Sequence, residues 1–217
     1  MSDVNRWHRT VSSLPDQSHT QSRIVNHLQE SLLLCAKVAC LAQSRDNQAT
    51  FDSWMHLYSQ LQTLRSSQSA EEVLPILTSP IAGLSSSKHK HWSTKTPADF
   101  PIQIHTSRVS FYSAFLDQLT CLLLLRSKPR KVFGRDAKSL KTTTWHAVEI
   151  CGLSMSNPLF WSWDPVVVAA LIHAGPTLSY AAQQKELLEH LRRLEKLTGW
   201  GIRKALQDLE DNWRIGS

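Results

Sequence analysis

The sequence predicts an all-α fold, an irregular bundle of about seven or eight helices. After residue 20, apolar residues recur every three or four positions through most of the chain, which is the spacing of one helix face. Alternation of apolar and polar residues over five or more positions is rare, so no strand is expected. With 217 residues and an apolar fraction of 41%, the chain is long enough to bury one substantial core.

Composition divides the chain into four segments. Residues 1–20 are polar and are predicted to form a disordered arm, and residues 21–78 are predicted to form N-terminal helices. Residues 79–104 contain three Pro and a Ser-Ser-Ser run and are predicted to be a loop. Residues 105–217 are predicted to be a C-terminal helical regulatory region. The helices are expected at 21–43, 48–65, 70–77, 105–127, 143–155, 165–174, 179–198 and 201–214.

Helix boundaries are marked most clearly near the C-terminus. Asp164 precedes Pro165, which predicts a capped helix start with proline in the first turn. Gly175 is predicted to end that helix. Gly199 is predicted to end the next one, with Trp200 as the apolar residue just beyond.

Two apolar features are expected inside the protein. The stripe of the first helix includes Leu28, Leu32 and Cys35, and the run 119–125 is apolar nearly all round, which is typical of a buried helix. That run is much shorter than the ~20 residues of a membrane span. No signal peptide is recognisable, so we expect a soluble intracellular protein without membrane contact.

Cysteine and tryptophan are also expected to be buried. The four Cys lie in apolar, helix-like surroundings and are predicted to be reduced, buried thiols. A core role is predicted for the Trp residues that flank the C-terminal helices. These residues are Cys35, Cys40, Cys121, Cys151, Trp161, Trp163, Trp200 and Trp213.

Motifs for catalysis or metal binding are scarce. Seven Gly leave little material for phosphate-binding loops, and Cys35 and Cys40 point in different directions on a helix. His146 and His173 could act as general bases, although a packing or capping role is the simpler interpretation. His89 and His91 could touch a metal, although a solvated loop is the simpler interpretation. No catalytic, cofactor or metal residue is assigned, and a small helical enzyme or ligand-binding module stays open as an alternative.

A basic stretch lies at 126–141, with seven Lys or Arg against one acid. It is interpreted as a solvated surface, a nuclear localisation patch or a phosphate-binding patch, and these alternatives stay open. The residues concerned are Lys128, Arg130, Lys131 and Arg135. The net charge of +6 favours acidic partners only weakly. Direct DNA binding by this chain is not expected, because no recognition motif is visible.

Four stretches together carry a family resemblance. They are FYSAFLDQLTCLLLLRSKPRK (111–131), TWHAVEICGLSMSN (144–157), LIHAGPTLSYAAQQKELLEHLRRLEKLTGW (171–200) and LQDLEDNW (206–213). In this order they resemble the C-terminal part of the regulatory, or middle homology, domain of fungal zinc-cluster transcription factors, close to the nitrate-assimilation activators.

The resemblance implies a nuclear regulator whose helical domain contacts other transcription regulators or co-regulators. A cytoplasmic pool, and a homodimer or a heterodimer as the form of that contact, are left open. In the family an N-terminal six-Cys zinc cluster binds DNA, and this chain, with four Cys, lacks that cluster. Zinc is therefore expected only in the missing cluster. We expect either a truncated gene product or a free-standing partner of a complete regulator. The family motifs imply packing roles for Trp145, His146, Cys151, Gly199, Trp200 and Trp213.

Overall fold

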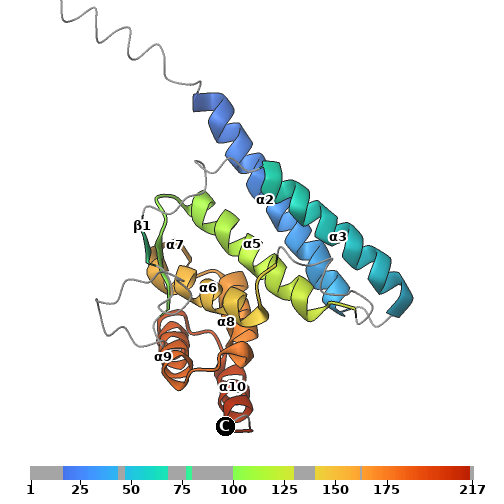
Figure 1. Ribbon diagram of the computed structural model, residues 1–217. Coiled ribbons are helices and arrows are strands. Elements are labelled where there is room, and N and C mark those ends of the chain that lie inside the picture. The colour runs from blue at the N-terminus through green and yellow to red at the C-terminus, as the bar shows by residue number, and fades with distance from the viewer. Residues whose placement is uncertain are drawn as a thin grey trace, which may run out of the picture.

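The computed structural model describes residues 17–43, 47–67, 77–79, 100–129, 140–161 and 163–215. Within these residues the protein is all-α, as predicted (Figure 1). Within these ranges seven helices are ten residues or longer. The α-helices are α2 (Gln17–Gln43), α3 (Asn47–Ser67), α5 (Arg108–Arg126), α6 (Thr143–Ser156), α7 (Pro158–Trp161), α8 (Pro165–Ala174), α9 (Ala181–Thr198) and α10 (Arg203–Ile215). A 3-10 turn, η1 (Gly175–Thr177), follows α8, and the strands are β1 (Leu77–Ser79) and β2 (Ile102–Ile104).

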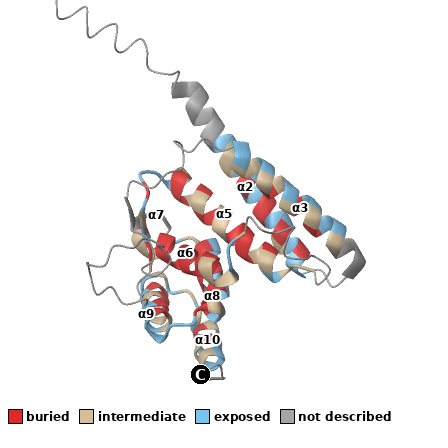
Figure 2. Cartoon of the chain, viewed as in Figure 1, coloured by how far each residue is buried: buried red, intermediate tan, exposed pale blue. Residues whose placement is uncertain are grey.

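Two hydrophobic clusters organise the helices. In the first, which we call the hairpin core, α2 and α3 lie side by side and close over the C-terminal half of α5 (Figures 1 and 2). Trp54 is fully buried at its centre. The hairpin core consists of Leu34, Val38, Leu41, Trp54, Leu57, Leu61, Cys121 and Leu124.

The second cluster, the main core, joins α5 and α6 to the C-terminal helices. Phe111 and Phe115 stack with ring centroids 5.7 Å apart on the buried face of α5. Ile150 of α6, Leu171 of α8 and Leu187 of α9 are likewise fully buried in this cluster. α5 therefore contributes side chains to both clusters, as its buried residues in Figure 2 show.

The apolar character of α5 is that of a core helix. By length and composition alone its 19 residues could cross a membrane, but 56% of the window is buried inside the protein. α2 and α6 pack along it, so its side chains are already covered by protein. A mostly buried helix of this kind is weak evidence for a membrane span.

Side-chain caps explain several helix starts. The hydroxyl of Ser107 accepts a hydrogen bond from the Ser110 amide at 3.1 Å, and Asp164 accepts one from the Val166 amide at 2.8 Å. Pro165 occupies the first turn of α8, as predicted. Gly199 ends α9 with φ 72°, the left-handed conformation that favours glycine, so this prediction is confirmed too.

The expectation of no strand is wrong. β1 and β2 pair antiparallel, with Leu77 opposite Ile104, so the predicted loop 79–104 ends in a strand at 102–104. The predicted helix 70–77 is also wrong at Leu77, which belongs to β1; its other residues lie outside the described ranges. Three-residue strands are too short to show alternation, and these two become a pair only through a contact between distant segments.

Pro101, beside β2, explains why position 152 is glycine. A Cβ atom at Gly152 would lie 2.4 Å from the Pro101 carbonyl oxygen and 2.6 Å from its Cγ. α6 and the segment before β2 can approach this closely only without a side chain at that point.

Four further expectations need correction. Leu32 is 55% exposed, because Leu32, Leu33 and Leu34 are each about 100° apart around α2 and cannot all face the core. Cys40 is exposed, since it lies on the opposite side of α2 from Cys35. Trp163 is 67% exposed in the turn before α8. Finally, α2 begins at Gln17, inside the segment predicted to be a disordered arm.

Candidate protein-binding groove

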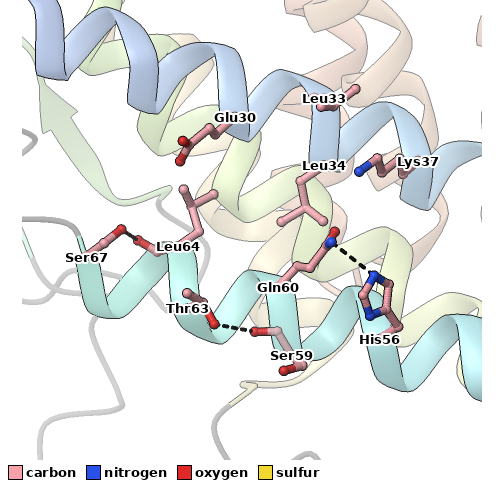
Figure 3. A pocket seen from close by; sticks show the side chains of 10 residues that line it. All are labelled: Glu30, Leu33, Leu34, Lys37, His56, Ser59, Gln60, Thr63, Leu64 and Ser67. Atoms are coloured by element: carbon pink, nitrogen blue, oxygen red, sulfur yellow. Dashed lines mark hydrogen bonds between the residues drawn. The ribbon is translucent and has the colours of Figure 1, made fainter.

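A groove runs between α2 and α3 on the side away from α5 (Figure 3). Its α2 wall consists of Glu30, Leu33, Leu34 and Lys37, at positions i, i+3, i+4 and i+7 of one helix face. Its cavity volume is about 350 Å³. The α3 wall consists of His56, Ser59, Gln60, Thr63, Leu64 and Ser67.

Leucine side chains form the apolar part of the groove. Leu34 is buried and belongs also to the hairpin core, whereas Leu33 is 58% exposed. Leu32, 55% exposed, lies next to Leu33 outside the groove. Two adjacent leucines that are more than half exposed on one helix form an apolar ridge that another protein could cover.

The α3 wall is polar but largely satisfied by its own helix. The Thr63 hydroxyl donates to the Ser59 carbonyl at 3.1 Å, and Ser67 donates to the Leu64 carbonyl at 2.8 Å. Gln60 and His56 share a hydrogen bond of 3.1 Å between side-chain nitrogens (Figure 3). Because these groups already have partners, the wall can contact a bound helix without needing new hydrogen bonds.

Opposite charges mark the two ends of the α2 wall. Glu30 and Lys37 are separated by seven residues, or about 10.5 Å along the helix axis. Leu33 lies between them, so this face of α2 presents an acidic, an apolar and a basic side chain in that order (Figure 3).

An ion pair fixes α3 on α5 beneath the groove. The guanidinium of Arg65 donates to both carboxylate oxygens of Asp117, at 2.8 and 2.7 Å, and to Cys121 Sγ at 2.9 Å. Burial alone would lower the pKa of Arg65, but the hydrogen bonds and charge of Asp117 raise it above its usual value. Burial and the Asp117 charge raise the pKa of Cys121, so its thiol stays protonated at neutral pH and is a poor nucleophile.

The two histidines considered as general bases, His146 and His173, lie on different helices. His146 is buried between α5 and α6, where its Nδ1 bonds Gln118 Oε1 at 2.7 Å. Burial and the nearby Arg65 charge lower the pKa of His146 to about 4, so it is neutral at physiological pH. His173 lies exposed in the last turn of α8. Neither lines the groove, and His89 and His91 lie outside the described residues.

The other residues singled out from the sequence are scattered. In the basic stretch, Lys128 is half-buried, while Arg130, Lys131 and Arg135 lie outside the described residues. Cys151 is fully buried in the main core. Within the described ranges, no group of three or more His, Cys, Asp or Glu is arranged to hold a metal ion.

Of the three tryptophans in the stretches that carry the resemblance, Trp200 and Trp213 pack at the edge of the main core. Trp145 is half-buried and contacts the His146 ring edge-on, with centroids 4.9 Å apart. Trp200 is also half-buried against the main core. The Trp213 indole donates to the Gly175 carbonyl at 3.1 Å, which ties α10 to the end of α8.

A buried polar cluster joins β2 to α6 and makes the folding stability of the protein depend on pH. Gln103 donates to the carboxyl of Glu149, and burial raises the pKa of Glu149 to about 7 against the opposing effect of that bond. The folded protein therefore keeps this proton up to about pH 7, whereas the unfolded chain releases it near pH 4.5. Stability from this group is present at low pH and is lost as the pH rises through 7.

Replacing Glu149 with glutamine should remove that dependence. The stability of Glu149→Gln relative to wild type is expected to rise by about 2 to 3 kcal/mol between pH 5 and pH 8. Urea denaturation of both proteins at several pH values measures this difference. His146 acts in the opposite direction below pH 6.5, but it is present in both proteins and cancels in the comparison. Glu189→Gln, at an exposed carboxylate, is the control, and a flat difference for Glu149→Gln would contradict the prediction.

The groove was missed from the sequence. Its α2 wall includes part of a run of three leucines, Leu32 to Leu34, and a helix that is packed on one side only leaves part of such a run exposed. Its α3 wall comes from a second helix, so only the packing of α2 on α3 creates the cavity. Fold and groove together define an all-helical protein with an open, helix-lined groove. No family model matches the chain, and neither a curated protein nor a solved structure gives a significant match.

Proposed function

We propose that this protein is a helical transcription-regulatory module that acts by binding a helix of a partner regulatory chain in the groove between α2 and α3. The observation that carries the proposal is the groove itself, with the half-exposed Leu33 between an acid and a base. A groove between two helices accepts the side-chain ridge of a third helix, and amphipathic helices bind in this way.

The transcriptional role comes from the sequence. The ordered motifs of residues 105–214 resemble the regulatory domain of fungal zinc-cluster factors, a domain that acts through contacts rather than catalysis. A nuclear location, alone or shared with the cytoplasm, goes with that role. The basic stretch at 126–141 would serve as the localisation signal.

The charge pattern narrows the partner helix. It would present an apolar residue to Leu33, a base to Glu30 and an acid to Lys37. Such charge pairs at a rim mainly set specificity and orientation, while the buried leucine contact contributes affinity.

A reporter assay tests the proposal. The full chain is fused to an unrelated DNA-binding domain, and transcription from a matching promoter is measured in fungal cells. We expect the fusion to raise or lower transcription at least fivefold, and Leu33→Asp to remove most of that change because a carboxylate cannot be buried in the apolar contact.

The chain offers a matched control for this variant. Leu197, on α9, is 63% exposed against 58% for Leu33, and it lies outside the groove. Leu197→Asp should leave the reporter signal unchanged. A fusion without effect on transcription, or equal effects of the two variants, would refute the proposed function.

A further inference from the structure

We propose that the helix that occupies the groove is α2 of a second copy of this chain, so that two α2 helices pair antiparallel about a two-fold axis near Leu33 and Leu34. This inference rests on the proposed function, since it names the partner of the same groove. Burial of both leucine ridges would drive the pairing, and the charges would set its direction.

The charges make the α2 wall complementary to itself. Glu30 lies three and a half residues before the midpoint between Leu33 and Leu34, and Lys37 lies three and a half residues after it. In an antiparallel pair centred there, Glu30 of each copy faces Lys37 of the other. In a parallel pair, Glu30 would face Glu30 and Lys37 would face Lys37, which is repulsive.

The apolar residues fit the same arrangement. Leu33 of each copy would lie against the groove of the other, beside the buried Leu34. An interface about a two-fold axis uses one surface patch on both copies, and this wall meets that requirement with a single helix face. The α3 wall, whose hydroxyls bond their own backbone, would flank the second α2 on each side.

Cysteine placement distinguishes the two orientations. Cys40 is exposed on α2, and the other three cysteines are buried. In the antiparallel pair the two Cys40 residues would be about 20 Å apart along the axis, too far for a disulfide. In a parallel pair they would face each other. A cysteine at position 33 would lie close to its copy in either orientation, so its cross-link reports the pairing itself, and Cys40 reports the orientation.

Charge reversal is the first test. Self-association of the full chain is measured by sedimentation equilibrium at low salt. Lys37→Glu and Glu30→Lys should each weaken the dimer at least tenfold, since each variant places like charges together. An equimolar mixture of the two variants, and the double variant, should both regain dimers, because each restores Glu–Lys pairs across the interface.

Cross-linking is the second test. Under mild oxidation, Leu33→Cys in a Cys40→Ser background should give a disulfide-linked dimer, and the wild-type chain with Cys40 should not. Cross-linking through Cys40 would overturn the antiparallel arrangement. A wild-type chain that stays monomeric at high concentration, or a mixture that fails to regain dimers, would overturn the inference.

The two proposals can fail separately. If the chain is monomeric but Leu33→Asp still abolishes the reporter signal, the groove binds a different helix and the proposed function stands. If the dimer forms as described but no fusion affects transcription, the pairing stands and the transcriptional role falls.

Discussion

Replacing Trp54 with alanine is expected to lower the free energy of unfolding by about 3 to 5 kcal/mol. The Trp54 side chain is fully buried in the hairpin core, stacks on Tyr58 with centroids 5.3 Å apart, and donates to the Leu124 carbonyl at 2.8 Å. Alanine would leave a large cavity between α3 and α5. The Ser127 hydroxyl lies 3.3 Å from the same carbonyl, so most of the expected loss comes from packing rather than from the hydrogen bond.

Urea denaturation followed by circular dichroism measures this loss. Trp163→Ala is the control, because Trp163 is 67% exposed and its removal should change stability by less than about 0.5 kcal/mol. A loss of several kcal/mol is a large part of the stability of a typical domain. Equal melting curves for the two variants would show that the hairpin core is not packed as described.

Asn157→Ala is expected to have a comparable effect, about 3 to 5 kcal/mol, for a different reason. The buried Asn157 amide donates to the carbonyls of Gln103 at 2.6 Å and Leu153 at 2.8 Å, and its oxygen accepts from the His105 amide at 2.9 Å. Removing it leaves buried backbone groups without partners, and it removes two of the hydrogen bonds that hold β2 and the adjoining His105 against the end of α6.

Asn212 provides a close control. Its side chain is exposed and donates to the carbonyl of Asp208, four residues earlier, at 2.9 Å, just as Asn157 does to Leu153. Asn212→Ala should cost less than about 0.5 kcal/mol, so the difference between the two variants reports on burial and on the contacts to β2. Thermal unfolding of both variants gives the comparison, and similar melting temperatures would contradict the assigned network.

Structural features that depend only on neighbouring residues in the chain were predictable from the sequence. Asp164 caps the start of α8 with its side chain, Pro165 fits the first turn, and Gly199 ends α9 with a left-handed backbone, so the structure places those boundaries as expected. The buried run in α5 was equally clear, because a helix that is apolar nearly all round must be covered by protein.

Features that depend on contacts between distant segments were not predictable. The β1–β2 pair has no pattern of its own, and the network of Asn157 requires β2 to lie against the end of α6. The exposure of Leu32, Cys40 and Trp163 depends on which faces the neighbouring helices cover. The groove likewise exists only because α3 packs beside α2.

α5 contributes to both clusters of buried residues, with Phe111 and Phe115 in the main core and Cys121 and Leu124 in the hairpin core. Neither cluster can therefore come apart without exposing one face of this helix to water. The two parts of the protein should consequently unfold in one cooperative transition. A partner that binds the outer face of α2 would then stabilise the whole chain against denaturation, including helices that it never touches.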